Sequence, residues 1–139
     1  MTEITYPLFT KPNKYEQFIN QTIYKMNIEE LREYCIAKKF VTESFPFDEE
    51  VLVFKVMNKM FLLTNINKDL SMNVKCDPEK AIELREQYSS VLPGWHMNKK
   101  HWNTVDIDGS ISDDLLKKWI DDSYDLIVSK LPKKLQNDF

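Results

Sequence analysis

The residues best suited to chemistry in this chain lie together in one segment, Pro93–Thr104, which combines tryptophan, histidine, lysine and asparagine side chains. No acidic residue occurs from Gln87 to Val105, although Asp and Glu outnumber Lys and Arg by 22 to 19 in the whole chain. Lysine and asparagine contact phosphate groups, and tryptophan stacks on bases or sugars. The segment is therefore a candidate nucleic-acid interface. In the alternative interpretation, Trp95 and Trp102 are core residues and the lysines between them only face solvent.

The predicted nucleic-acid site combines this segment with two lysines of a predicted hairpin. Lysine, histidine and asparagine side chains would contact phosphates, while a tryptophan would stack on a base or support the loop. The site residues are Lys55, Lys59, Asn98, Lys99, Lys100, His101, Trp102 and Asn103. Because the formal net charge is −3, this site would be a local positive patch on a mildly acidic protein.

Residue patterns typical of enzymes do not occur in the sequence. It contains no G-x-S-x-G, Walker-type, G-x-G-x-x-G or H-E-x-x-H pattern, and only 2 glycines are available for a phosphate-binding loop. His96 and His101 lack a recognisable third metal ligand. The acidic groups at residues 48–50 and 113–122 could attract a divalent ion, but a strand border and a helix N-terminus also explain them. We therefore expect no catalytic residue, no metal and no cofactor.

Cysteine use and hydropathy indicate the compartment. Cys35 and Cys76 are far apart and form no C-x-x-C pair, whereas a secreted domain held by disulfides would normally contain more cysteines. The N-terminus shows no basic patch followed by an apolar run. No apolar stretch approaches the roughly 20 residues that span a bilayer. We expect a cytoplasmic protein without membrane contact.

Hydrophobic periodicity predicts the elements that must position the candidate site. A first helix is expected over residues 13–25, and a second from Asn27, whose side chain and Glu30 form a capping box, to about Lys39. The second helix is expected to bury Ile28, Leu31, Cys35 and Ile36. Period-two patterns then predict four consecutive antiparallel strands at residues 41–47, 51–57, 59–64 and 70–76, with a hairpin turn at Asn58.

The second half of the chain is expected to add two helices and one strand. Asp77-Pro78-Glu79 is a typical helix start, and this helix would end before Pro93. A loop leads into a fifth strand at 102–107, and Ser112 caps a final helix that ends at Pro132. This order predicts the α+β class, with an antiparallel sheet and helices packed on one face. We divide the chain into an N-terminal extension, 1–25, and a single domain, 26–139.

Several motifs in the chain resemble the MmcQ/YjbR family. The longest is P-G-W-H-M-N-K-K-H-W-N, from Pro93 to Asn103, in which residues 97–103 match position by position. The shorter ones are Pro46-Phe47-Asp48 before the hairpin, Cys76-Asp77-Pro78 at a helix start, Asp121 to Tyr124, and Lys130-Leu131-Pro132. The resemblance extends from about Met26 to about Lys134 and covers the whole expected domain.

The resemblance implies a CyaY-like (frataxin-like) sandwich and a role in DNA binding, with the antiparallel strands and their hairpins acting as wings. Carried onto this chain, the matching residues are Met97, Asn98, Lys99, Lys100, His101, Trp102 and Asn103. The alternative is an adaptor that binds another protein or a small ligand through the same Trp/His/Lys segment, with little salt dependence. Metal handling, suggested by the frataxin-like architecture and the acidic groups, is a further alternative.

Overall fold

A computed structural model describes Lys14 and residues 25–139, so most of the helix predicted over residues 13–25 lies outside the described residues. Within these residues, six antiparallel strands form one sheet in the order β1-β2-β3-β4-β6-β5. The strands are β1 (Val41–Ser44), β2 (Val51–Val56), β3 (Lys59–Asn65), β4 (Ser71–Lys75), β5 (Val91–Pro93) and β6 (Trp102–Asp106). The helices are α2 (Ile28–Ile36), α3 (Pro78–Gln87), α4 (Asp113–Ser129) and α5 (Lys133–Gln136).

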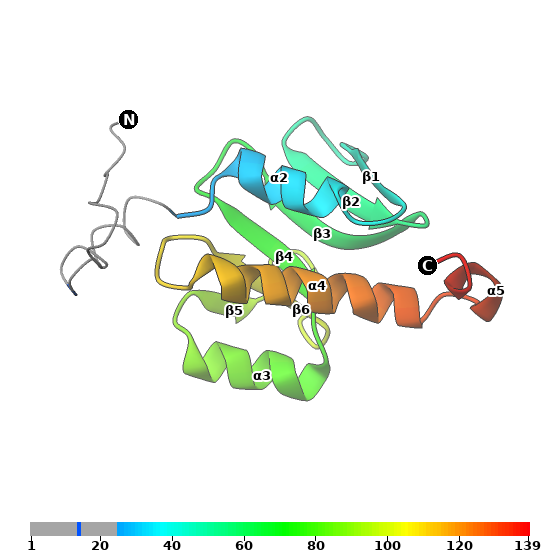
Figure 1. Ribbon diagram of the computed structural model, residues 1–139. Helices are drawn as coiled ribbons and strands as arrows, with labels where there is room; N and C mark the ends of the chain where they lie inside the picture. Colours follow the sequence, from blue (N-terminus) through cyan, green and yellow to red (C-terminus); the bar gives the residue numbers. More distant parts are fainter. Residues whose placement is uncertain (1–13, 15–24) are drawn as a thin grey trace, which may run out of the picture.

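Helices α2, α3 and α4 all pack on the same face of the sheet, with the long α4 lying between the other two (Figure 1). Their apolar side chains and those of the strands form one core, which includes Leu31 of α2, Leu84 of α3 and Ile120 of α4. Phe61 of β3 meets the ring of Tyr124 edge-on, with 5.4 Å between centroids. The predicted α+β class, with an antiparallel sheet and helices on one face, is confirmed.

Side chains at the N-termini of three helices explain where these helices begin. The Asn27 carboxamide accepts a hydrogen bond of 2.8 Å from the Glu30 N–H, and Asp77 accepts one of 3.3 Å from the Lys80 N–H. Ser112 accepts one of 3.2 Å from the Leu115 N–H. Each cap satisfies one of the amides that the first turn of a helix leaves without a partner. All three predicted starts are therefore confirmed.

Ser123 joins α4 to the sheet at the point where β3 and β4 diverge. These two strands pair only through Leu62↔Val74 and Leu63↔Asn73. Beyond these pairs, the Ser123 hydroxyl donates to the Phe61 carbonyl at 2.6 Å and accepts from the Lys75 N–H at 2.8 Å. Because Ser123 has no exposed surface, this hydroxyl replaces a backbone ladder bond inside the core.

The structure differs from the sequence predictions mainly at element ends. The second helix ends at Ile36 rather than near Lys39, and Ile36 is 38% exposed rather than buried. The strand expected over 41–47 ends at Ser44, because residues 45–50 form a loop. Strand β5 was not predicted, since its 3 residues include a proline and show no alternation. Within the described residues, no helix is long and apolar enough to cross a membrane.

Candidate nucleic-acid interface

The face of the sheet opposite the helices, which we call the open face, carries a second, smaller apolar cluster. Side chains alternate along a strand, so the neighbours of core residues point to this face. Val53 of β2, Leu63 of β3 and Trp102 of β6 are buried there together. Met97, from the connection between β5 and β6, packs against this cluster. The connection, residues 94–101, therefore folds onto the open face.

Hydrogen bonds within the loop and to β6 fix the conformation of the 94–101 loop. The Gly94 N–H donates to the Trp102 carbonyl at 2.9 Å, and the Trp102 N–H donates to the Asn98 carbonyl at 3.0 Å. The Asn98 carboxamide accepts from the Lys100 N–H at 2.9 Å, and the Lys99 ammonium donates to the Gly94 carbonyl at 2.9 Å. A Cβ at Gly94 would lie 2.8 Å from the Trp102 Cβ, so only glycine fits there without a shift.

Two predicted site residues, Trp102 and Asn103, lie in the interior, with 8% and 1% of their surface exposed. The Asn103 carboxamide accepts from Arg85 Nε at 2.7 Å and donates to the Ala81 carbonyl at 3.3 Å. Arg85 also donates to the carbonyl oxygens of Lys99 and Trp102. This placement does not fit the predicted surface role. These residues instead anchor the 94–101 loop to α3 and the sheet.

Trp95 lies at the surface, with 66% of its area exposed. Its backbone is held between β4 and β6, since its N–H donates to Thr104 Oγ1 at 2.8 Å and its carbonyl accepts from Asn73 Nδ2 at 3.4 Å. Its ring meets that of His96 edge-on at 4.8 Å, and His96 has a φ of 56°, in the left-handed region. Trp102 therefore supports the loop from the interior, whereas Trp95 is available to a ligand.

The strand register brings the remaining predicted residues to one end of the sheet. Lys55 at the end of β2 pairs with Met60, next to Lys59 at the start of β3. Lys75 at the end of β4 pairs with Trp102 at the start of β6. Asn98, Lys99, Lys100 and His101 precede β6 directly and thus lie at the same end. We call this end of the sheet, with Lys55, Lys59, Lys75, Lys99, Lys100 and, at the end of α4 on the helix-covered face, Lys130, the basic end.

Lys75 and Lys130 are members of the basic end that sequence reasoning missed. Burial lowers the pKa of Lys75, and the positive charge of the neighbouring Lys130 lowers this pKa further. Lys130 is the C-cap of α4, so the helix brings its ammonium to Lys75. Neither lysine lies in a charge run, and only the contact between α4 and β4 joins them.

The lysines of the basic end have no carboxylate partner among the residues that the structure describes. The ion pairs among the described residues are Arg32–Glu43, Lys38–Asp121, Lys80–Glu83 and Lys118–Asp122, and none of them includes a lysine of the basic end. On the open face the basic end is lined by Lys55, Met60 and Lys75. An uncompensated cationic cluster attracts a polyanion more strongly than paired lysines would.

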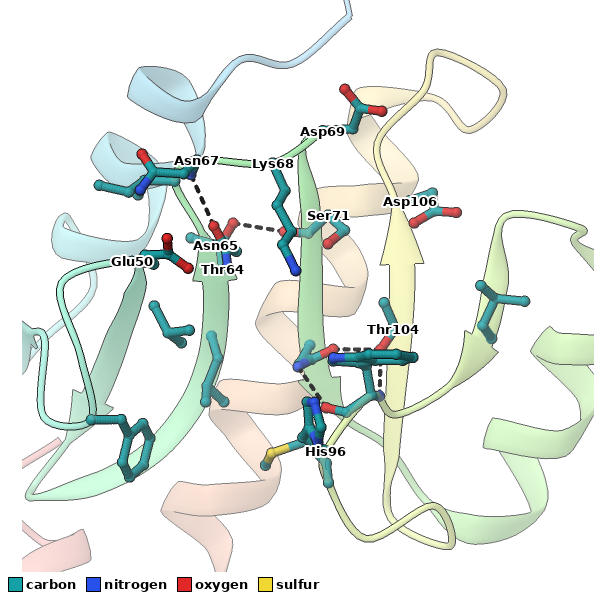
Figure 2. Close-up of a pocket in the computed structure, with 18 of the residues that line it drawn as sticks. Glu50, Thr64, Asn65, Asn67, Lys68, Asp69, Ser71, His96, Thr104 and Asp106 are labelled. Carbon is teal, nitrogen blue, oxygen red and sulfur yellow. Dashed lines mark hydrogen bonds between the residues drawn. The ribbon is translucent and has the colours of Figure 1, made fainter.

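The opposite end of the open face is acidic. Asp106 at the end of β6 pairs with Ser71 at the start of β4, close to Asp69. Burial raises the pKa of Asp106, and the negative charges of Asp108 and Asp69 raise it further. A groove of about 1470 Å³ begins at this end and runs along the open face to His96 (Figure 2). The open face is therefore polarised between lysines and carboxylates.

No group of three or more His, Cys, Asp and Glu side chains in the described part of the chain is arranged to hold a metal ion. Among the described residues, the side chains of His96 and His101 also form no hydrogen bond. Cys35 is fully buried, and burial raises its pKa to about 12, which keeps the thiol protonated and unreactive.

A family model and individual relatives of this chain agree on one family. The YjbR family model matches residues 36–126. YjbR of Escherichia coli K12 is 36% identical over 110 residues, which cover 78% of this chain and 93% of that protein. YbdF of Escherichia coli O157:H7 is 38% identical over 109 residues, covering 78% of this chain and 89% of that one.

Two solved structures share the fold. Protein DR2400 of Deinococcus radiodurans, which contains a DUF419 domain, superposes with a TM-score of 0.77 at 40% identity, covering 85% of this chain and 90% of that one. A Pseudomonas syringae protein superposes with a TM-score of 0.63 at 27% identity, covering 73% of this chain and 98% of that one. With the family model matching most of the sheet and its helices, the chain belongs to the YjbR family.

Proposed function

We propose that this protein binds nucleic acid through its basic end and catalyses no reaction. The observation that supports this most directly is the convergence of Lys55, Lys59, Lys75, Lys99, Lys100 and Lys130 from separate elements, with no carboxylate partner among the described residues. Clusters of unpaired lysines provide the electrostatic part of nucleic-acid affinity by releasing counterions from phosphates.

The dimensions of the basic end suit a duplex. Neighbouring strands are about 4.8 Å apart, so Lys55 on β2 and the 94–101 loop that precedes β6, three positions apart in the sheet, lie about 14 Å or more from each other, because β3 and β4 diverge at this end. The major groove of B-DNA is about 12 Å wide, so the two sides of the basic end can contact phosphates on both of its edges. The β2–β3 turn and the 94–101 loop would lie along the two backbones like wings.

The remaining site residues have separate roles in this proposal. Lys99 has two N–H groups left for phosphate after its bond to the Gly94 carbonyl, and Lys100 is fully available. Asn98 and His101 lie in the same loop, where Asn98 already bonds the Lys100 N–H. Trp102 and Asn103 hold the loop in place. A phosphate between Lys75 and Lys130 would relieve the repulsion between them, which adds to burial in lowering the Lys75 pKa.

We further propose that the protein works in a reducing compartment, the cytoplasm. Cys35 and Cys76 are both free thiols, one buried and one half-buried. Neither contributes to the open face, so oxidation would add nothing to the proposed site.

Fluorescence anisotropy with a labelled duplex of about 20 base pairs, at about 20 mM and about 200 mM salt, tests this function. The variant is Lys99→Ala/Lys100→Ala, and the matched control is Lys68→Ala/Lys80→Ala, which removes the same charge outside the basic end. We expect the first variant to reduce the slope of log Kobs against log salt by about 2, at about one unit for each phosphate contact. Equal losses in both variants, or no binding at the lower salt concentration, would refute the proposal.

A second pair of variants locates the rest of the site. Lys75→Ala and Lys130→Ala should each weaken duplex binding and reduce the salt slope by about 1. If the Lys75→Ala and Lys130→Ala variants bind the duplex as strongly as wild type while Lys99→Ala/Lys100→Ala does not, the interface is limited to the loop.

A further inference from the structure

The groove on the open face forms a site separate from the basic end. It lies between the 45–50 loop on one side and Trp95 with His96 on the other, and it crosses β3, β4 and β6. Figure 2 shows Asp69 and Asp106 at one end of it and His96 at the other. Its volume of about 1470 Å³ exceeds the range of about 300–1000 Å³ that is usual for small-molecule pockets. The groove therefore has room for a chain segment rather than for a single metabolite.

Exposed apolar side chains gather along the walls of the groove. Phe47 is 65% exposed and Trp95 is 66% exposed, one on each side. Ile66 and Leu92 also line it, with 42% and 46% of their surfaces exposed. Large apolar groups at the surface cost free energy in water, and their concentration on one concave face marks a binding surface.

The charged groups of the groove are mostly negative. Four carboxylates, those of Asp48, Glu50, Asp69 and Asp106, line it together with Lys68. Asp48 is stabilised by the N–H groups of Glu50 and Val51, each at 2.8 Å. The side chains of Glu50, Asp69 and Asp106 have no hydrogen bond or ion pair among the described residues. These three carboxylates would gain free energy from an incoming cation and would repel nucleic acid.

The floor of the groove is already ordered. Thr104 Oγ1 donates to Asn73 Oδ1 at 2.5 Å and accepts from the Trp95 N–H at 2.8 Å. The Thr64 hydroxyl donates to the Ser71 carbonyl at 2.7 Å. Side chains that bond one another in this way need no rearrangement when a ligand binds, which reduces the entropy that binding costs.

We propose that this groove binds an extended segment of a partner protein in which lysine or arginine alternates with apolar or aromatic residues. In an extended segment, alternate side chains point the same way, so apolar residues can contact Phe47 and Trp95. The charged head groups of the intervening lysine or arginine side chains can reach the carboxylates at the rim. Charge complementarity selects a basic partner, and the carboxylates keep this site distinct from the proposed nucleic-acid site.

Tryptophan fluorescence provides a readout specific to the groove. Trp95 is 66% exposed, whereas Trp102 and Trp119 are 8% and 5% exposed. Quenching by acrylamide therefore reports mainly on Trp95. The probe is an eight-residue peptide that alternates Lys with Leu and Phe, and its counterpart has Glu in place of Lys. We expect the basic peptide to shift the emission to the blue and to protect Trp95 from acrylamide, and the acidic peptide to do neither.

Isosteric variants separate groove binding from general attraction to an acidic protein. Asp69→Asn/Asp106→Asn should weaken binding of the basic peptide at least tenfold. The control Glu86→Gln/Asp125→Asn, which neutralises two exposed carboxylates on α3 and α4, should leave it within twofold. Trp95→Ala should weaken binding, measured by anisotropy of a labelled peptide. Equal losses in the two double variants, or binding that leaves Trp95 accessible to acrylamide, would overturn the proposal.

Discussion

Replacing Ser123 by alanine tests whether a single hydroxyl closes the gap between β3 and β4. The substitution leaves the Phe61 carbonyl and the Lys75 N–H without their bonds of 2.6 and 2.8 Å. A buried polar group that loses its partner costs about 1–3 kcal/mol. Two such groups cost about 2–6 kcal/mol, and the better helix propensity of alanine returns about 0.5 kcal/mol. We therefore expect a net loss of about 1.5–5.5 kcal/mol from a total that is typically about 5–15 kcal/mol.

Urea unfolding at equilibrium measures this loss, with Ser129→Ala on the same helix as the control. The Ser129 hydroxyl is exposed and donates to the Leu126 carbonyl, so its removal should change stability by less than about 0.5 kcal/mol. Hydrogen exchange adds a local measurement, because the Lys75 amide should lose protection in Ser123→Ala and keep it in Ser129→Ala. A Ser123→Ala protein as stable as the control, with a protected Lys75 amide, would refute the reasoning.

Three further substitutions test the loop and the acidic end. Gly94→Ala places a Cβ 2.8 Å from the Trp102 Cβ, so we expect a loss of about 1–3 kcal/mol in urea unfolding. Asn103→Ala removes the acceptor of Arg85 and should cost about 1–3 kcal/mol and weaken duplex binding in anisotropy, although Asn103 is buried. Asp106→Asn should raise the melting temperature at pH 7. The pKa of Asp106 is raised in the folded state, so its charge destabilises the protein above that pKa, and the gain should disappear as pH falls below the unfolded value of about 3.8.

Local signals in the sequence predicted most of the fold. The caps at Asn27, Asp77 and Ser112 depend on side chains three residues from their amide partners, so they can be recognised without any tertiary contact. The hairpin turn was equally accessible, since Met57 and Asn58 take positive φ values of 47° and 66°, a conformation that asparagine tolerates. The spacing of apolar residues in the sequence likewise predicted β2 and β4 as strands.

Features that depend on pairing between distant segments were not accessible. Strand β5 exists because Val91, Leu92 and Pro93 pair with β6, and nothing in its own 3 residues indicates a strand. Lys75 and Lys130 are 55 positions apart by number and meet only because α4 crosses the end of β4. The sequence also could not distinguish Trp95 from Trp102, because their exposure depends on which side of the sheet the loop covers.

The polarity of the open face explains how one acidic chain can present two sites of opposite preference. Antiparallel pairing places the ends of β2 and β4 beside the starts of β3 and β6, and these positions carry Lys55, Lys59 and Lys75. The other ends of the same strands carry Asp69 and Asp106. The net charge of −3 is therefore distributed unevenly: positive and negative side chains are separated along the strands. A polyanion and a basic segment would each be attracted to one end and repelled by the other, so neither ligand needs a helix or lid to exclude it from the wrong site.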